Sequence, residues 1–320
     1  MTPAPSVDVV VPIHGGRALT QQCLATLAEQ TCVHRTIVVD NASPDDSVAA
    51  LRTAFPRVEL LELGANRGYA SACNAGIAAG EADVVVLLNN DVLLPADFLE
   101  RLVAPLAADA ALGSATPLLL RPDRTTIDNA GLTADATLAG FPRHQGRLAG
   151  TATEARPSLL GPSGAAGAYR REALAAVEGL DEAIFLYQED LDLALRLRAA
   201  GWPTTLAPDA VGVHLGSATS LRRSAAQRRH SGFARGYLLR RYGVLRGRHA
   251  ARALATELVV AAGDLLISRD AAALRGRLAG WSAAAGAPRR RPPRDALEAS
   301  IGLRASLRLR RADYAVAASS

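Results

Sequence analysis

The chain contains no lysine, a single methionine and aromatic residues at only 4% of its 320 positions. Because 49% of the residues are hydrophobic, the core must be built from Ala, Val and Leu, and the length suffices for one large α/β domain with an appendage or two modest domains. The three cysteines, Cys23, Cys32 and Cys73, lack the C-x-x-C or Cys/His spacing of metal sites. Their odd number and spacing argue against a cysteine-based metal site and favour a reduced intracellular chain.

Signals for export or for crossing a membrane are also lacking. Met1–Val7 contains no basic stretch leading into an apolar run, so a signal peptide is not expected. The longest apolar stretch of the C-terminal third, Leu254–Ile267, is interrupted by Glu257 and Asp264 and is too short to span a bilayer. We therefore expect a cytoplasmic protein that is soluble or peripheral on the inner face of the cell membrane.

The charges are distributed unevenly along the chain. Residues 1–221 carry 15 Arg and 25 acidic residues, whereas residues 222–320 carry 21 Arg and 6 acidic residues. An acidic body followed by a basic, helical region suggests two different partners or surfaces. We therefore expect a catalytic domain over residues 1–220 and a basic helical region over residues 221–320.

The first 120 residues alternate between β-rich and helical stretches. The β-rich runs are Asp8–Ile13, Thr36–Asp40, Val58–Leu63, Asp83–Leu88 and Ser114–Leu120. Helix-like spacing of apolar residues is found at Leu19–Gln30, Asp45–Ala54, Ala70–Ala79 and Ala96–Ala108, and further on at Arg171–Val177 and Glu189–Ala200. Apolar runs such as V-V-V-L-L favour a Rossmann-like, mostly parallel sheet with helices on both faces. Residues 121–160 are expected to be irregular, with room for a hairpin.

Four successive strand ends carry Asn, Asp or Gly. They are Pro12-Ile13-His14-Gly15-Gly16, Val38-Val39-Asp40-Asn41-Ala42-Ser43, Asn66-Arg67-Gly68-Tyr69 and Leu87-Leu88-Asn89-Asn90-Asp91. Each by itself is also explained by helix caps or tight turns. Since ligands of such sheets bind beyond the carboxyl ends of the strands, the four together predict a polar rim that suits a base, a ribose and phosphates.

Asp91 ends a fully apolar strand, where an unpaired carboxylate is costly. A diphosphate ligand adds negative charge, so the site needs a cation, and oxygen ligands of this kind suit Mg²⁺ or Mn²⁺. His214, which follows a second β-rich run, is a candidate further ligand. The alternatives are an N-cap for Asp91, at the helix that begins near Pro95, and a purely structural role for His214.

Five acids fall within the twelve residues from Asp181 to Asp192. Helix capping accounts for one or two of them. Asp192 and Arg196 are spaced to pair on one helix face, which leaves Glu189 or Asp190 to face a cleft. We favour Asp190 as a general base that takes a hydroxyl proton.

The order of these motifs resembles family 2 glycosyltransferases with the GT-A fold, close to the rhamnosyltransferase-like branch. The matching pieces are V-V-V-P-I-H-G-G, V-V-D-N-A-S, N-R-G-Y-A-S-A-C-N-A-G-I, L-L-N-N-D-V, L-D-E-A-I-F-L-Y-Q-E-D-L-D-L-A-L-R-L-R-A-A-G-W and V-H-L-G-S, spread over residues 7–220. The resemblance implies inverting transfer of a sugar, with dTDP-rhamnose as a candidate donor, to an acceptor hydroxyl of a glycan, a lipid-linked glycan or a small molecule. The Q-x-x-R-W motif of processive synthases is absent, so one sugar is expected per encounter.

The resemblance also implies roles for single residues. Asp91 and His214 would bind the metal, and Asp190 would be the catalytic base. The donor would be contacted by Pro12, His14, Asp40, Asn41, Asn66, Gly68, Asn74, Asn89 and Asn90. The acceptor would be contacted by Glu189, Asp192 and Trp202. Two departures affect base selectivity and metal affinity: His14-Gly15-Gly16 replaces a Tyr-Asn-type turn, and Asn89-Asn90 replaces an acid.

Other interpretations of the chain stay open. A sugar-phosphate nucleotidyltransferase would need a Gly-rich phosphate loop, which His14-Gly15-Gly16-Arg17 matches only faintly, and a non-catalytic glycan-binding scaffold would not need the acids. The nine arginines between Arg222 and Arg248 form either a solvated helical face or a dock for an anionic membrane. Nucleic acid is not expected as a partner, because no recognition module is visible. The oligomeric state is open.

Overall fold

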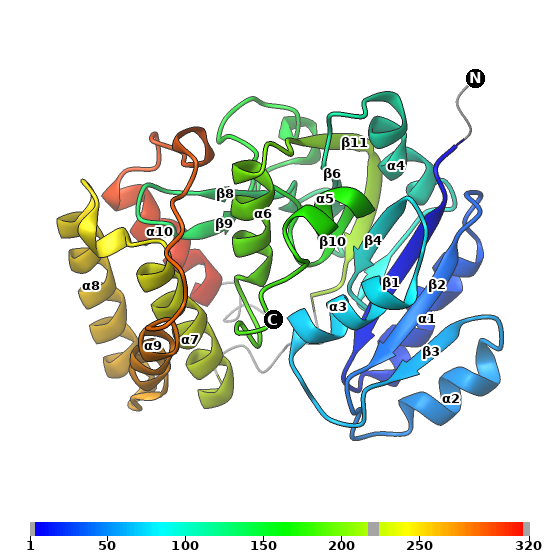
Figure 1. Cartoon of the computed structure of the whole chain (residues 1–320), viewed down its shortest axis with the longest axis horizontal. Coiled ribbons are helices and arrows are strands. Elements are labelled where there is room, and N and C mark those ends of the chain that lie inside the picture. The colour runs from blue at the N-terminus through cyan, green and yellow to red at the C-terminus, as the bar shows by residue number, and fades with distance from the viewer. Residues whose placement is uncertain (1–3, 217–223, 316–320) are drawn as a thin grey trace.

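The computed structural model describes residues 4–216 and 224–315. Ser217 of the V-H-L-G-S motif, the predicted boundary at residue 220 and the first two arginines of the basic run, Arg222 and Arg223, lie outside the described residues. Within these ranges the chain forms one central mixed sheet, flanked by helices, with a second helical body at one end of its long axis (Figure 1).

The sheet has nine strands in the order β3-β2-β1-β4-β10-β6-β11-β5, with β7 paired to β6. The strands are β1 Val7–Ile13, β2 Arg35–Asp40, β3 Glu59–Glu62, β4 Val84–Leu88, β5 Val92–Leu93, β6 Ser114–Leu120, β7 Ile127–Asn129, β10 Ala166–Arg170 and β11 Thr204–His214. β3, β2, β1 and β4 are parallel to one another, as are β6 and β11. β10, β5 and β7 run antiparallel to their neighbours. β10 does so because the 121–165 segment returns the chain to the sheet at the carboxyl edge.

Helices cover both faces of the sheet because the parallel strands are buried on both sides. They are α1 Arg17–Ala28, α2 Ser47–Ala54, α3 Tyr69–Ala79, α4 Phe98–Ala108, α5 Arg171–Ala176 and α6 Glu189–Ala199. On one face, Val9 and Val11 of β1 share a core with α1 and α4. On the other face, Val10 of the same strand packs with residues of α3, α5 and α6. The predicted α/β class and the predicted placement of helices are therefore confirmed.

The segment predicted to be irregular is only partly so. It contains β7 and a two-stranded hairpin of β8 Leu132–Ala134 and β9 Gly140–Pro142, followed by the short turn η1 Ala149–Thr151. The hairpin lies between the sheet and the C-terminal helices (Figure 1). It therefore links the two parts of the molecule.

The C-terminal region is helical, as predicted. It comprises α7 Ala225–Arg241, η2 Val244–Arg246, α8 Ala250–Ser268, α9 Ala272–Ala283, η3 Arg294–Ala296 and α10 Leu303–Ala315. One hydrophobic cluster joins it to the rest: Leu191 and Leu195 of α6 and Leu138 beside the hairpin pack with Tyr237 and Leu238 of α7. The predicted domain boundary near residue 220 stays a prediction. Residues from both sides of this boundary pack into one hydrophobic core. In the described part of the chain, no helix is both long enough and apolar enough to cross a membrane.

Candidate active site

Strand register brings the predicted strand ends to one edge of the sheet. Ile13 pairs with Asp40, and Asp40 with Glu62, so β1, β2 and β3 end side by side. The start of the antiparallel β10 lies beside the end of β4. At the other end of the sheet, Val213 pairs with Leu120, which puts the end of β11 at the same edge. The prediction of a shared polar rim is therefore confirmed.

Asn41 organises the part of the rim formed by β1, β2 and the loop after β3. Its side-chain amide donates to Asn66 Oδ1 at 3.0 Å and to the Gly68 carbonyl at 3.1 Å, and its Oδ1 accepts from Arg67 N at 2.8 Å. His14 Nδ1 lies 3.0 Å from the Asn41 carbonyl oxygen. The structure thus brings four of the predicted donor-binding residues together around the buried side chain of one of them, Asn41.

The other predicted donor residues lie at the same edge, in different environments. Asp40 is buried and accepts from Ser43 N at 3.0 Å, while Pro12 is enclosed within β1. Asn90 donates to Thr20 Oγ1 of α1 at 2.8 Å, and Asn89 N donates to the Ala165 carbonyl at 2.9 Å. These contacts position the rim; their role toward a donor stays a prediction.

Asn74 does not fit the predicted role in the donor pocket. Its Oδ1 accepts from Leu180 N, and its Nδ2 donates to the Leu180 carbonyl and to Glu182 Oε1, all at 2.9 Å. These bonds use the acceptor and both donor hydrogens of the amide. Asn74 therefore fastens α3 to the loop that precedes α6, and its role is corrected to a positioning one.

Asp91 and His214 meet at the ends of β4 and β11. Asp91 is buried, and its Oδ1 lies 3.3 Å from His214 Nε2. The other ring nitrogen, Nδ1, lies 2.8 Å from Oδ2 of Asp128, which belongs to β7. Burial alone lowers the pKa of His214, but the two flanking carboxylates outweigh it and raise that pKa to about 10.

These side chains suit a hard divalent cation. Asp91 Oδ1 is buried and accepts no hydrogen bond among the described residues, so an acceptor is left over. Asp128 accepts from Nδ1 of His214, the partner arrangement that orients metal-binding histidines. Among residues 4–216 and 224–315, no cluster of three or more His, Cys, Asp or Glu could hold a metal by itself. Two protein ligands leave room for phosphate oxygens and water, which Mg²⁺ characteristically retains.

Asp190 lies in the first turn of α6, and two backbone amides donate to its carboxylate. Its Oδ2 accepts from Gly164 N at 2.8 Å, and its Oδ1 accepts from Leu191 N at 2.7 Å. Tyr69, the first residue of α3, donates its hydroxyl to the Gly164 carbonyl at 2.8 Å. The residues flanking β10 and α3 therefore determine where the Asp190 carboxylate lies. Burial raises the pKa of Asp190 above its ordinary value.

Glu189 is buried, in contrast to the predicted acceptor contact. Its Oε2 finds no hydrogen-bond partner among the described residues. Burial, helped by the neighbouring Asp190 carboxylate, raises the pKa of Glu189 to about 8. The raised pKa favours the uncharged form of Glu189, and its burial gives no support to the predicted acceptor contact.

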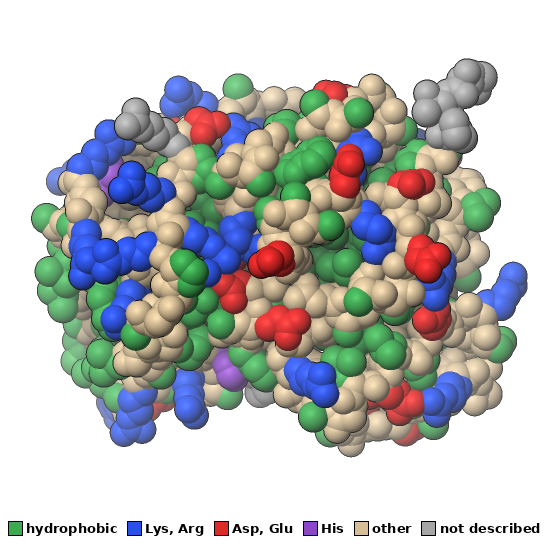
Figure 2. Space-filling model, viewed as in Figure 1, with side chains coloured by type: hydrophobic (Ala, Val, Ile, Leu, Met, Phe, Trp, Pro, Cys, Tyr) green, Lys and Arg blue, Asp and Glu red, His purple; other side chains and the backbone are tan. Residues whose placement is uncertain are grey.

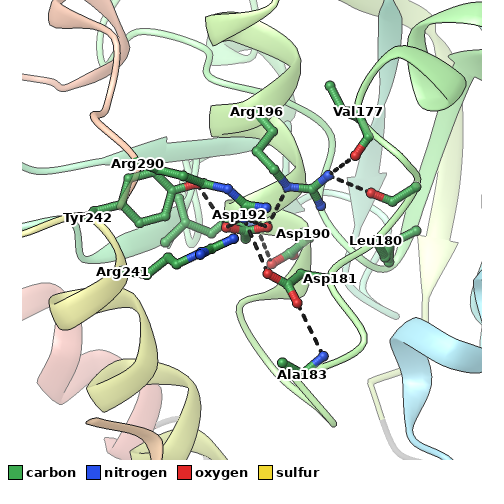
Figure 3. A network of polar contacts seen from close by, with 12 residues as sticks. Val177, Leu180, Asp181, Ala183, Asp190, Asp192, Arg196, Arg241, Tyr242 and Arg290 are labelled. Atoms are coloured by element: carbon green, nitrogen blue, oxygen red, sulfur yellow. Dashed lines mark hydrogen bonds and ion pairs between the residues drawn. The ribbon is translucent and has the colours of Figure 1, made fainter. Parts of the chain in front are cut away.

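Asp192 is the centre of a buried network and does not reach an acceptor. Arg196 Nε donates to its Oδ2 at 2.6 Å, which confirms the predicted pairing within the helix. Tyr242 and Arg290, both from the C-terminal region, also point at this carboxylate, at 2.8 Å and 3.0 Å (Figure 3). The side chain has no solvent exposure, so the prediction of an acceptor contact is wrong. Asp192 instead joins α6 to the C-terminal helices.

Trp202 lies at the wrong end of the sheet for the predicted acceptor contact. It precedes β11, whose far end carries His214, and it packs against Gly113 at the start of β6. Its neighbours belong to the core that includes Leu197 and Ala173. Trp202 is therefore a half-buried side chain packed against this core, and the prediction of an acceptor contact is corrected too.

A continuous set of polar contacts connects the two halves of the site. Gly164 holds Asp190, and the adjacent Ser163 donates its hydroxyl to Asn129 Oδ1 at 2.8 Å. Asn129 in turn donates to Asp128 Oδ2 at 3.0 Å, and Asp128 holds His214 beside Asp91. The proposed base and the candidate metal ligands therefore share one edge of one sheet.

Sequence patterns did not identify three residues that position the site: Asp128, Ser163 and Tyr69. Asp128 lies in the segment without periodicity, and its one signal is a polar pair, Asp128-Asn129, after an apolar residue. Tyr69 was visible only as part of a turn motif. Their partners lie far along the chain, 86 residues away for Asp128 and 95 for Tyr69.

A cavity of about 760 Å³ lies elsewhere, between the hairpin and the C-terminal helices. It is lined by Ala136, Leu138, Tyr242, Gly243, Val244, Gly247, Arg248, His249, Arg252, Pro292, Pro293, Leu297 and Ala299. None of the predicted site residues is among them. The cavity is therefore separate from the sheet edge that carries Asp91 and Asp190.

The fold is therefore that of an α/β protein with a carboxylate–histidine pair, Asp91 and His214, and a second carboxylate, Asp190, at one edge of its sheet. The family model described as Glycosyl transferase family 2 matches residues 8–177, and the chain belongs to this family. The chain is 31% identical over 200 residues to the N-acetylglucosaminyl-diphospho-decaprenol L-rhamnosyltransferase of Mycobacterium tuberculosis, a match that covers 56% of this chain and 65% of the relative. It is 29% identical over 221 residues to an N-acetylglucosaminyltransferase of Bradyrhizobium diazoefficiens, covering 65% and 44%. The matches thus span less than two thirds of these relatives.

Solved structures share the fold. The mannosyltransferase PcManGT of Pyrobaculum calidifontis, in complex with GDP-Man and Mn²⁺, has a TM-score of 0.54 at 22% identity, over 89% of this chain and 87% of that chain. GalNAc-T7, with UDP, GalNAc and Mn²⁺, has a TM-score of 0.62 at 11% identity, over 84% and 55%. The predicted GT-A fold is confirmed.

Proposed function

We propose that the protein is a metal-dependent glycosyltransferase that moves a sugar from a nucleoside diphosphate to an acceptor hydroxyl with inversion. The observation that supports this most is the chain of polar contacts that runs from Asp190 through Asp128 to His214 and Asp91. A carboxylate and a candidate cation site on one sheet edge suit a single displacement at the anomeric carbon.

Each of the site residues has a separate role in this reaction. Asp190 takes the proton of the acceptor hydroxyl, whose oxygen forms the new bond to the anomeric carbon. The bond from that carbon to the phosphate oxygen breaks, and the electron pair leaves on the nucleoside diphosphate. Asp91 and His214 would hold Mg²⁺ or Mn²⁺, which when bound supplies positive charge to the departing diphosphate. Asp128 keeps the His214 ring in place for this task.

The donor pocket is proposed to lie over Asp40, Asn41, Asn66 and His14, beside the cation site. The named mycobacterial relative and the motif resemblance support an L-rhamnosyl donor carried by dTDP and an acceptor carried on a polyprenyl diphosphate. Both are proposals for this chain.

The nucleotidyltransferase alternative is disfavoured by the loop after β1. Gly15 N donates to Ser43 Oγ at 2.6 Å, and Gly16 N donates to Asp45 Oδ2 at 3.1 Å. Amides already bonded to a hydroxyl and a carboxylate do not form a phosphate-binding loop. The scaffold alternative gives no reason for a buried Asp91 Oδ1 that accepts no hydrogen bond among the described residues and lies 3.3 Å from His214 Nε2.

The test is transfer from a panel of nucleotide sugars, with and without Mn²⁺, to simple and lipid-linked acceptors. We expect metal-dependent transfer from at least one donor, and binding of the matching nucleoside diphosphate in a thermal-shift screen. Absence of both transfer and nucleotide binding, in a folded protein supplied with metal, would overturn the proposal.

A further inference from the structure

Helix α8 presents an entirely apolar face to solvent. Its nine exposed residues are Ala251, Leu254, Ala255, Leu258, Val259, Ala262, Leu265, Leu266 and Ile267. Leu266 and Ile267 are 77% and 78% exposed. Two leucines of α9, Leu274 and Leu278, are exposed as well. We call these eleven residues the α8–α9 apolar face. In water such a surface is costly, so it indicates a partner.

The charged residues of α8 face the protein interior. Glu257 is buried and pairs with Arg235 of α7 at 2.7 Å, with Arg277 of α9 at 3.2 Å and with Arg310 of α10 at 3.4 Å. Ion pairs from three neighbouring helices therefore determine the rotation of α8. The exposure of its apolar side follows from this packing and is not a fraying of one end.

The exposed charges around the apolar face are positive. Arg246 and Arg248 precede α8, Arg269 follows it, and Arg275 lies between the two leucines of α9; all four are exposed. Figure 2 shows green side chains with blue ones among them along the left edge, where Figure 1 places α8. An apolar face with cations at both ends of the helix matches the acyl–headgroup boundary of an anionic bilayer.

We propose that the α8–α9 apolar face docks on, and inserts shallowly into, an anionic membrane surface. Helix α8 is about 28 Å long at 1.5 Å per residue, so it would lie in the plane of the interface. A second copy of the chain fits less well. An antiparallel pairing of two α8 helices would bring Arg246 and Arg248 against the partner's Arg269, where like charges repel.

This mode differs from the electrostatic docking expected from the basic run. Three of the five arginines from Arg228 to Arg241 are occupied by the protein itself: Arg235 and Arg241 are buried, and Arg228 pairs with Asp270. Leucines supply the contact, and the exposed arginines select the charge of the lipid. The proposal does not depend on the reaction at Asp190, because binding is measured without a donor.

The experiment is flotation of the full chain with vesicles of phosphatidylcholine, alone or mixed equally with phosphatidylglycerol. The test variant is Leu258→Gln with Leu266→Gln. The matched control is Val33→Gln with Leu148→Gln, which changes two apolar residues outside the α8–α9 apolar face that are 91% and 68% exposed, against 62% and 77% for Leu258 and Leu266. All four positions are exposed, so the thermal midpoints should match that of the wild type.

We expect the wild type and the control to float with the anionic vesicles and to bind phosphatidylcholine alone more weakly. The Leu258/Leu266 variant should lose about tenfold or more in affinity, since two insertable leucines are removed. Unchanged binding by this variant, or no vesicle binding by the wild type, would overturn the proposal. A dimer in light scattering that dissociates in this variant would overturn it in favour of a self-association surface.

Discussion

Replacing Asp190 by Asn removes the carboxylate that is proposed to take the acceptor proton. The side chain keeps its size, and its remaining oxygen can still accept from Gly164 N, which now lies 2.8 Å from Asp190 Oδ2. General-base catalysis contributes about 10²- to 10⁴-fold, so kcat should fall by that factor. Nucleoside diphosphate binding should stay near the wild-type value, because the proposed donor residues lie on other strand ends.

Glu189→Gln is the matched control, since it makes the same chemical change one residue earlier in the same helical turn. Burial and the neighbouring Asp190 carboxylate raise the pKa of Glu189, which favours its protonated, uncharged form. A neutral amide should therefore replace it with little effect on transfer.

The same raised pKa predicts a pH effect on stability. Glu189 binds its proton more tightly in the folded chain than at its ordinary value of 4.5. The contribution of this proton to the free energy of unfolding is therefore fully present below pH 4.5 and is lost as the pH rises through about 8. Thermal unfolding across this range should show a decline in the wild type that is smaller in Glu189→Gln.

For Asp190→Asn and its control, Glu189→Gln, sugar transfer is measured as initial rates with saturating donor and metal. Binding of the nucleoside diphosphate is measured by thermal shift. Transfer by Asp190→Asn at the wild-type rate would refute the assignment of the base. An equal loss in both variants would instead attribute the effect to packing of the first turn of α6.

Three further predictions follow from the buried contacts. Asp128→Asn should weaken the apparent affinity for Mn²⁺ about 10- to 100-fold, because it loosens His214; activity titrated against metal measures this, and an unshifted titration contradicts it. Glu257→Gln should cost about 3–5 kcal/mol of unfolding free energy by urea denaturation, since three arginines lose their buried counter-charge. Tyr242→Phe should cost about 1–3 kcal/mol, because its hydroxyl bond to the buried Asp192 is lost; a change within experimental error would show that Arg290 and Arg196 suffice.

Local sequence patterns were enough to locate the sheet and its polar edge. Buried apolar runs predict parallel strands, and parallel strands must present their carboxyl ends together. The i, i+4 spacing likewise predicted the pairing of Asp192 with Arg196. Both inferences use only neighbours in the sequence or a general property of sheets.

The roles of Asp192, Asn74 and Trp202 could not be obtained in this way. The partners that bury Asp192 come from Tyr242 and Arg290, 50 and 98 residues further along the chain. The side chain of Asn74 is hydrogen-bonded to Leu180, in a loop 106 residues further along the chain. Whether a polar side chain faces a ligand or a distant segment depends on which segment arrives there, and the local pattern carries no such information.

Helix α8 is the clearest example of what the sequence and the tertiary structure each determine. Its sequence by itself determined that an apolar stretch, Leu254–Ile267, is interrupted by two acids, Glu257 and Asp264. Only the tertiary structure decided which side faces water: three arginines from α7, α9 and α10 surround Glu257 and turn the charged side inward. Burying that charge with its counter-charges left the leucines outside, which no periodicity could predict.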